Sequence, residues 1–223
     1  MATTLALLRD RVEQILADTG NAIWSTDDVD EGIRRALHEY SKTRPQVAIG
    51  TVTLTADARE IDVSSLTGIL SVARVWCDYT ASDPEDPPNE RQFEWWPDQV
   101  KIYVLGGDEP QNGDVCRIWY TKMQTLNGLD SETSTSLRVD DETLIAEGAS
   151  GFAATSRAVD LAEQVTLDRL TAQQIRAWGM AQLQRFRAGL KRVMAAEALR
   201  GDARVEVDKL DHWDQSSDLG GWA

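Results

Sequence analysis

Residues that support catalysis and metal binding are scarce in this chain of 223 residues. It has two cysteines and two histidines, and it contains no GxSxG, HExxH, CxxC, P-loop or GxGxxG pattern. His38 lies beside the apolar stripe of a predicted helix and His212 near the C-terminal end, so ordinary structural roles are favoured over catalysis. With no nucleophile–base pair and no metal cluster, we expect a protein that is not an enzyme and that holds no cofactor.

Positive charge is also in short supply. Lysine and arginine total 23 against 37 acidic residues, which gives a net charge of −14 and a pI near 4.5. Binding to nucleic acid requires clustered basic residues, so this charge balance argues against a nucleic-acid-binding protein. No apolar run approaches the roughly 18 residues of a membrane span. The N-terminus lacks the basic and apolar segments of a signal peptide, so we expect neither membrane insertion nor export.

The two cysteines, Cys77 and Cys116, both fall in predicted strands. They are able to form one disulfide. Without an export signal, reduced thiols inside a β-core are the favoured interpretation.

The N-terminal part of the chain has the spacing of amphipathic helices. Apolar residues three and four positions apart predict helices at 5–18 and 25–44, which a short loop joins as an antiparallel pair. Thr3 or Thr4 is the expected cap of the first helix, and Gly20 its end. Ser25 is the expected cap of the second helix, which Pro45 ends.

An acidic run opens the second helix. A metal site would need carboxylates converging on one point, whereas these lie in a first helical turn, where capping and the helix dipole account for them. The run consists of Asp27, Asp28, Asp30 and Glu31.

After Pro45 the apolar pattern changes to period two, which predicts an antiparallel β-unit of five or six strands up to about residue 125. Adjacent strand residues face opposite sides, so one of Trp95 and Trp96 is expected on the outer surface. Either a loop or helix of the same chain covers it, or it contacts another protein. A carbohydrate-binding face is disfavoured because secreted β-modules seldom have this helical majority.

Helical signals return near Asp140, where small residues from Gly148 to Ala154 favour close helix approach. A long helix is expected from 171 to 200, with Gly201 ending it. The predicted fold class is α+β, with N- and C-terminal helices in one bundle and an inserted antiparallel β-domain. The expected domains are 1–45 with 140–202 (helical bundle), 46–139 (β-domain with connecting loop) and 203–223 (extended C-terminal tail).

The long helix is basic within an acidic chain. Between 171 and 204 there are seven basic residues and two acidic ones. This face either pairs with acids of the same chain or contacts a neighbouring subunit, and nucleic-acid binding ranks third. The residues assigned to a subunit interface are Arg185, Arg187, Lys191 and Arg192.

Two stretches resemble the head–tail connector (neck adaptor) proteins of tailed bacteriophages. The N-terminal segment LRDRVEQILADTGNAIWSTDDVDEGIRRALHEYSKTRP resembles their N-terminal helix pair. The segment NGDVCRIWYTKMQTLNGLDSETSTSL, followed by DDETLIAEGASGFAA, resembles their last strand and returning helix. The inserted β-unit is larger than in the smallest connectors. The resemblance rests on hydrophobic pattern rather than on a catalytic signature.

The resemblance implies a structural role in the virion neck, after assembly in the host cytoplasm. Connectors of this kind form a ring on the portal protein, here expected to be a dodecamer. The ring extends the DNA channel and supports the next neck or tail protein. An acidic channel wall lets DNA pass without specific binding. A head-to-tail ring also needs two complementary patches on each subunit, which a basic helix and an acidic surface would supply.

The C-terminal tail carries large apolar residues among acids and glycines, which suggests a segment that orders on a partner. The resemblance implies that this partner is the portal. The alternative is that its tryptophans pack on their own domain. The tail residues assigned to docking are Val205, Val207, Leu210, Trp213, Leu219 and Trp222.

Two other functions stay open at this point. A nucleic-acid-associated regulatory protein would have a compact basic patch and salt-sensitive DNA binding. A cryptic enzyme would have a deep pocket with converging titratable groups.

Overall fold

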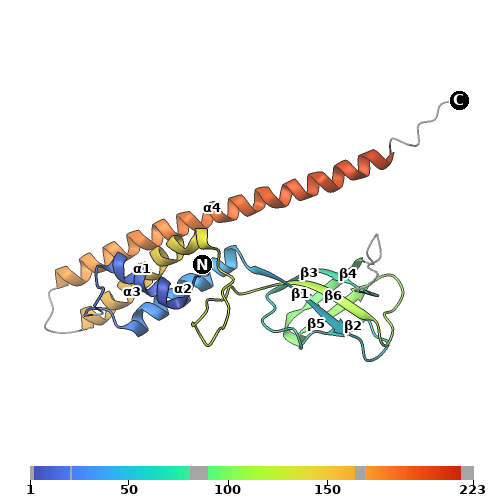
Figure 1. Ribbon diagram of the computed structural model, residues 1–223, viewed down its shortest axis with the longest axis horizontal. Coiled ribbons are helices and arrows are strands. Elements are labelled where there is room, and N and C mark those ends of the chain that lie inside the picture. The colour runs from blue at the N-terminus through green and yellow to red at the C-terminus, as the bar shows by residue number, and fades with distance from the viewer. Residues whose placement is uncertain (1–2, 21, 81–89, 164–168, 217–223) are drawn as a thin grey trace. The chain divides into compact units, whose positions relative to one another are not determined.

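The computed structural model describes residues 3–20, 22–80, 90–163 and 169–216, with 162–163, 169–170 and 199–216 as backbone only. Helices and an antiparallel sheet make up the chain, so the predicted α+β class is confirmed. The chain divides into two compact units (Figure 1). The helical unit comprises Met1–Arg44 and Thr125–Ala223, and the β-unit comprises Pro45–Gln124.

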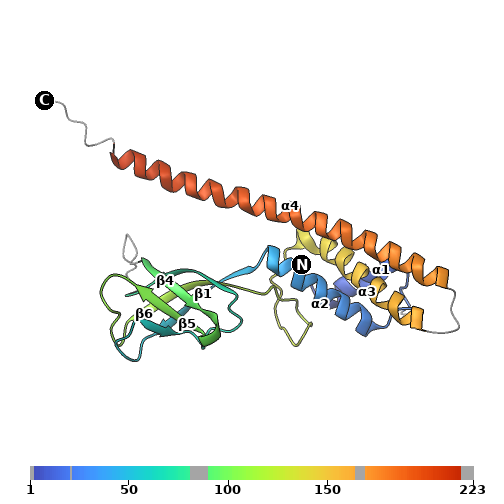
Figure 2. The ribbon, with the colours of Figure 1, turned by 180° about the vertical axis from the view of Figure 1, so that it is seen from behind.

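Four α-helices form the helical unit, and α3 packs against each of the others (Figure 2). Their apolar faces meet in one core, which includes the fully buried side chains of Leu8, Ile33 and Phe186. The elements are α1 (Leu5–Leu16), α2 (Thr26–Thr43), the short 3₁₀ helix η2 (Val139–Asp141), α3 (Glu142–Glu163) and α4 (Arg169–Ser216).

The predicted caps of the first two helices are confirmed at their N-termini. The Thr4 hydroxyl accepts the Leu7 N–H, and Ser25 forms a capping box that opens α2. The predicted end of α1 at Gly20 is wrong, because the helix stops at Leu16 with Ala17 in the left-handed conformation (φ 55°).

Asp18 organises the loop after α1. Its carboxylate accepts the backbone N–H groups of Ala22, Ile23 and Trp24 at 2.8–2.9 Å. Asp18 therefore ties the chain just after α1 to the residues that lead into α2.

Glycines allow α3 to approach its neighbours closely, as the run of small residues predicted. A Cβ on Gly148 would come within 2.8 Å of the Phe186 ring of α4. One on Gly151 would meet Leu183, also of α4, at 2.9 Å. Real Cβ atoms do not approach other atoms so closely, so these contacts require glycine.

The segment between the sheet and η2 is part of the helical unit. Leu126, Leu129 and Leu137 are buried in its core, and Leu5 donates its N–H to the Asn127 carbonyl at 3.0 Å. The compact β-unit therefore ends at Gln124, whereas the expected β-domain included residues 125–139 as a connecting loop. Three leucines without regular spacing gave no sign of this anchoring.

The prediction of an extended tail after Gly201 is wrong for residues 203–216, because α4 continues to Ser216. One glycine within a helix costs only about 1 kcal/mol relative to alanine. The residues after it include the good helix formers Ala203, Arg204 and Glu206. Gly201 therefore lies inside a helix of 48 residues.

Six strands form the β-unit in the order β1-β6-β3-β4-β5-β2, with every neighbouring pair antiparallel. The core between them includes Ile61, Val75, Ile102 and Ile118, all fully buried. The strands are β1 (Gln46–Thr53), β2 (Glu60–Asp62), β3 (Ser71–Trp76), β4 (Glu90–Trp96), β5 (Lys101–Leu105) and β6 (Val115–Lys122), with a 3₁₀ turn η1 (Pro97–Gln99) before β5.

The two cysteines are free thiols in this core. The Cys116 thiol donates to the Cys77 sulfur across 3.2 Å. This hydrogen bond and burial raise the pKa of Cys116.

Candidate interaction surfaces

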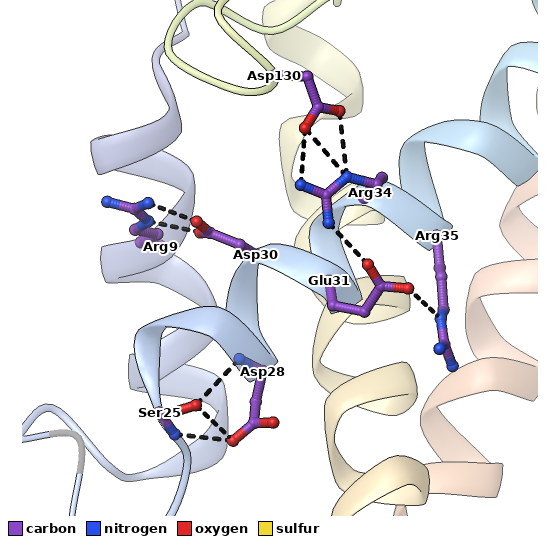
Figure 3. Close-up of polar contacts among 8 residues, drawn as sticks. All are labelled: Arg9, Ser25, Asp28, Asp30, Glu31, Arg34, Arg35 and Asp130. Carbon is purple, nitrogen blue, oxygen red and sulfur yellow. Dashed lines mark hydrogen bonds and ion pairs between the residues drawn. The ribbon is translucent and has the colours of Figure 1, made fainter.

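The acidic run of α2 stabilises the helical unit through local contacts (Figure 3). The Asp28 carboxylate accepts the Ser25 N–H at 2.9 Å, and the Ser25 hydroxyl accepts the Asp28 N–H, which confirms the capping interpretation for Asp28. Asp30 forms a two-point ion pair with Arg9 of α1, with N–O distances of 2.5 and 2.6 Å. Asp28 and Asp30 therefore bind partners within the helical unit, and their carboxylates do not converge on one point as metal ligands would.

Glu31 belongs to a second network that ties α2 to the segment after the sheet (Figure 3). It accepts from Arg35 and from Arg34, and Arg34 also pairs with Asp130 at 2.7 Å. The two arginines lower the pKa of Glu31, and Arg34 lowers that of Asp130. The network holds the 125–139 segment against α2.

No group of three or more His, Cys, Asp and Glu side chains in the described part of the chain is placed to hold a metal ion. His38 is an exposed residue of α2, and His212 lies where only the backbone of α4 is described.

The basic residues of α4 lie in two rows rather than on one face. Successive helical residues are about 100° apart around the axis. Leu183, Phe186 and Leu190 define the buried side of α4. The two rows lie on opposite flanks of the exposed side. The first row is Arg176, Arg187 and Lys191, and the second is Arg185 and Arg192.

Most of the exposed surface between the two rows carries alanine, together with the larger Gln184. The alanines leave the α4 backbone open to close approach by another helix. They are Ala177, Ala181, Ala188 and Ala195.

One of the four residues assigned to the subunit interface has a partner in its own unit. Arg187 pairs with Glu39 of α2 at 3.2 Å. Arg185, Lys191 and Arg192 are exposed and form no ion pair among the described residues. They are therefore the arginine and lysine side chains of this set that are available to a second molecule.

The tryptophan pair of β4 follows strand alternation. Trp95 packs against the β-core and Trp96 turns to the other side. There Trp96 stacks on Tyr103 of β5, with ring centroids 5.3 Å apart and planes 12° apart. Its Nε1–H donates to Glu94 at 3.4 Å, and both tryptophans are half-buried.

A larger aromatic cluster, not anticipated from the sequence, lies on the outer face of β3 and β6. The Trp76 and Trp119 rings are 4.3 Å apart. The Arg117 guanidinium lies over Trp119 and Tyr79, and it donates to the Tyr79 hydroxyl at 2.6 Å. The alternation Arg117, Trp119 opposite the buried Cys116 and Ile118 would have revealed this face.

Next to this cluster, β1 exposes apolar residues on the same outer face. Val47 is 67% exposed and Ile49 is 51% exposed. Ile49 lies directly across from Trp119 in the sheet. We refer to Val47, Ile49, Trp76, Arg117 and Trp119 as the outer sheet face.

The helical unit has one notable groove, of about 350 Å³, among its described residues. Trp24 lines it, and the Trp24 Nε1–H is buried without an acceptor among these residues. The lining is otherwise almost wholly apolar and comes from α1, the following loop and α4: Ile15, Leu16, Ala17, Gln174, Ile175 and Trp178.

The residues assigned to portal docking are placed only in part. Val205, Val207, Leu210 and Trp213 lie in the C-terminal part of α4, where the structure gives the backbone. Leu219 and Trp222 lie outside the described residues.

No protein-family model matches this chain, and no curated protein gives a match. Among the described helices, none combines the length and apolar character required to cross a membrane.

Proposed function

We propose that this protein is a structural subunit of a head–tail connector ring in the neck of a tailed bacteriophage. In this proposal the helical unit is a bundle that carries the β-unit as an insertion. The ring docks on the portal protein, extends the DNA channel and supports the next neck or tail protein. The pattern of the helix pair and of the last strand, described above, motivates this assignment.

The exposed side of α4 is the observation that carries the proposal. Two rows of basic residues flank a strip that is mostly alanine, and Arg185, Lys191 and Arg192 have no intramolecular ion pair among the described residues. A surface of this kind suits a neighbouring helix that approaches closely between the rows and presents carboxylates to both. In a chain with a net charge of −14, another copy is a ready source of carboxylates.

The helical unit itself exposes acidic side chains that can face such a helix. Asp10, Asp27, Glu132 and Asp160 are exposed and form no ion pair among the described residues. Each subunit then has basic rows on α4 and separate exposed carboxylates on other elements of the helical unit. Two different complementary patches are what a head-to-tail contact needs to close into a ring.

The length of α4 fits a protein that reaches beyond its own core. Its last described ion pair joins Glu197 to Arg44, the residue that follows α2, at 2.8 Å. The helix continues to Ser216, about five further turns. We propose that this C-terminal part of α4, together with the residues after it, contacts the portal.

Charge reversal on α4 tests the ring. The purified chain is examined by light scattering and negative-stain microscopy, alone and with DNA-filled heads. We expect rings for the native protein. The variants R185E/R192E and R176E/K191E, one for each row, should assemble less well, most clearly at low salt, where charge contacts are least screened.

A control with the same change in net charge is K42E/R138E, which reverses exposed residues away from α4. It should assemble like the native chain. A native protein that stays monomeric both alone and with heads would refute the ring. Normal assembly of both α4 variants would place the subunit contact elsewhere.

A further inference from the structure

Strand β1 leaves one of its two edges without a partner among the described residues. It lies at one end of the strand order and pairs only with β6, in an unbroken register from Gln46 opposite Lys122 to Thr53 opposite Val115. Its other edge therefore presents backbone groups to the surroundings.

Hydrogen bonds at the strand ends identify which residues these are. The Leu54 N–H donates to the Asp114 carbonyl. Residues that hydrogen-bond across an antiparallel pair alternate along the strand, so the β1 residues bonded to β6 are the even-numbered ones, including Val52 and Gly50. On the side of β6 that faces β3, the Val115 and Thr121 carbonyls accept the N–H groups of Tyr79 and Leu70, which flank β3. The even-numbered residues of β6 are therefore the ones that bond to β1. Both observations agree. The backbone groups directed to the free edge are those of Val47, Ile49, Thr51 and Thr53.

This edge lacks the features that protect sheet edges from pairing with other chains. Native edges are usually short, charged or interrupted by proline or a bulge. β1 has eight residues, QVAIGTVT, with no charge, no proline and no break in register. The opposite edge, β2, has three residues, and its two exposed positions are Glu60 and Asp62. The sheet is thus protected at one edge and open at the other.

The surroundings of the open edge are basic and aromatic. Strands β1, β3 and β6 contain no acidic residue, in a chain with 37 of them. Arg74 of β3 pairs with Glu90 of β4 at 3.1 Å, whereas Arg117 and Lys122 of β6, the strand next to β1, form no ion pair among the described residues. The outer sheet face adds Trp76, Trp119 and exposed aliphatic side chains, the residue types that dominate protein interfaces.

We infer that β1 is an acceptor edge for an extended, acidic segment of another protein, which adds to the sheet as a seventh strand. Backbone hydrogen bonds to Val47, Ile49 and Thr51 give affinity, as in other strand-addition complexes. Carboxylates of the guest project on the outer face, where Arg117 lies, and its alternate apolar side chains pack on the inner face beside Ala48 and Val52 at the edge of the core. This inference is independent of the ring contact on α4.

Charge favours a different protein over a second copy of this chain as the occupant. Two copies joined through β1 would place Arg117 and Lys122 of both chains on one continuous sheet with no carboxylate on the strands between them. The contact would also be two-fold symmetric and would stop at a dimer. An acidic guest strand instead places carboxylates beside β1 and β6, which have none of their own.

The test uses the full-length protein and a synthetic probe. The probe is a fluorescent ten-residue peptide in which valine or threonine alternates with glutamate. A second peptide has lysine in place of glutamate, and a third has a central proline. Binding is measured by fluorescence anisotropy, and hydrogen exchange reports protection of the β1 amides. We expect saturable binding of the acidic peptide below about 1 mM and weaker binding of the other two.

Two variants separate binding from folding. Thr51→Pro removes an N–H directed to the free edge and leaves the ladder to β6 intact, so it should keep its thermal stability and bind about tenfold more weakly. Thr51→Ala keeps the N–H and should bind like the native chain. Val52→Pro removes a ladder hydrogen bond and should lower stability.

The outcomes decide the inference. Loss of binding in Thr51→Pro, with added protection of β1 in the native complex, supports it. No binding of the acidic peptide, or equal binding of all three peptides, overturns it. Concentration-dependent dimers that Thr51→Pro abolishes also overturn it, because the occupant would then be a second copy.

Discussion

Gly32 of α2 lies against the backbone of Ala149 in α3. A Cβ on Gly32 would sit 2.6 Å from the Ala149 carbonyl oxygen, and backbone cannot rotate out of the way as a flexible side chain can. Gly32→Ala should therefore force the two helices apart. We expect a loss of about 1–3 kcal/mol in the free energy of unfolding, even though alanine is the better helix former.

Gly20 provides the matched control for this substitution. No atom lies within 4 Å of a Cβ placed there. Gly20→Ala should leave stability unchanged or raise it by up to about 1 kcal/mol. Urea unfolding monitored by circular dichroism measures both. Equal midpoints for the two variants would contradict the close helix contact.

Asp18 predicts a dependence of stability on acid. Its three backbone hydrogen bonds, with that of Trp24 contributing most, hold its pKa below the usual value of 3.8. A carboxylate with a lowered folded-state pKa stabilises the fold above its unfolded pKa, and this contribution is lost as pH falls through the folded pKa. Asp18→Asn should be less stable than the native chain at pH 7, and the gap should close below about pH 4.

Urea midpoints across this pH range check the prediction for Asp18. A gap of constant size from neutral to acidic pH would show that the charge of Asp18 is irrelevant. In that case the loss would come from loop geometry alone.

The two thiols should be unreactive in the native protein. Cys77 is 1% exposed and Cys116 is fully buried, and the raised pKa of Cys116 disfavours its thiolate. A thiol-specific reagent should label neither cysteine before unfolding and both in denaturant. Rapid labelling of the native chain would mean that the β-core opens readily.

Deletion of residues 203–223 should spare the helical unit. The described core contacts of α4 come from positions up to Val193, with Arg44 and Glu197 paired beyond them. The melting temperature should therefore stay within a few degrees of the native value. Under the proposed function, the deletion variant no longer co-sediments with DNA-filled heads. Trp213→Ala and Trp222→Ala should each weaken that attachment.

Local signals in the sequence predicted much of the fold. The spacing of Leu8, Val12 and Ile33 identified helical faces, and Ser25 with Asp28 identified a helix start. Period-two alternation identified the strands that contain Val75 and Ile118. In each of these cases, residues close in sequence carry the information.

Features that depend on distant residues were not predictable in this way. The 125–139 segment is anchored by Arg34 to Asp130 and by scattered leucines, a contact across about a hundred positions. A register shift between Val72 and Arg74 alters the simple alternation of β3. The outer sheet face needed the pairing of β1, β6 and β3, because Ile49 and Trp119 become neighbours only through the sheet.

The pairing of the first and last strands of the β-unit bears on how the gene can change. Gln46 and Lys122 lie directly opposite each other, so the chain enters and leaves this unit at adjacent points. A short turn from Arg44 to Thr125 would span the same gap without rerouting any helix. The whole β-unit is therefore a cassette that recombination can exchange, enlarge or remove in one event, while selection on the helices continues undisturbed.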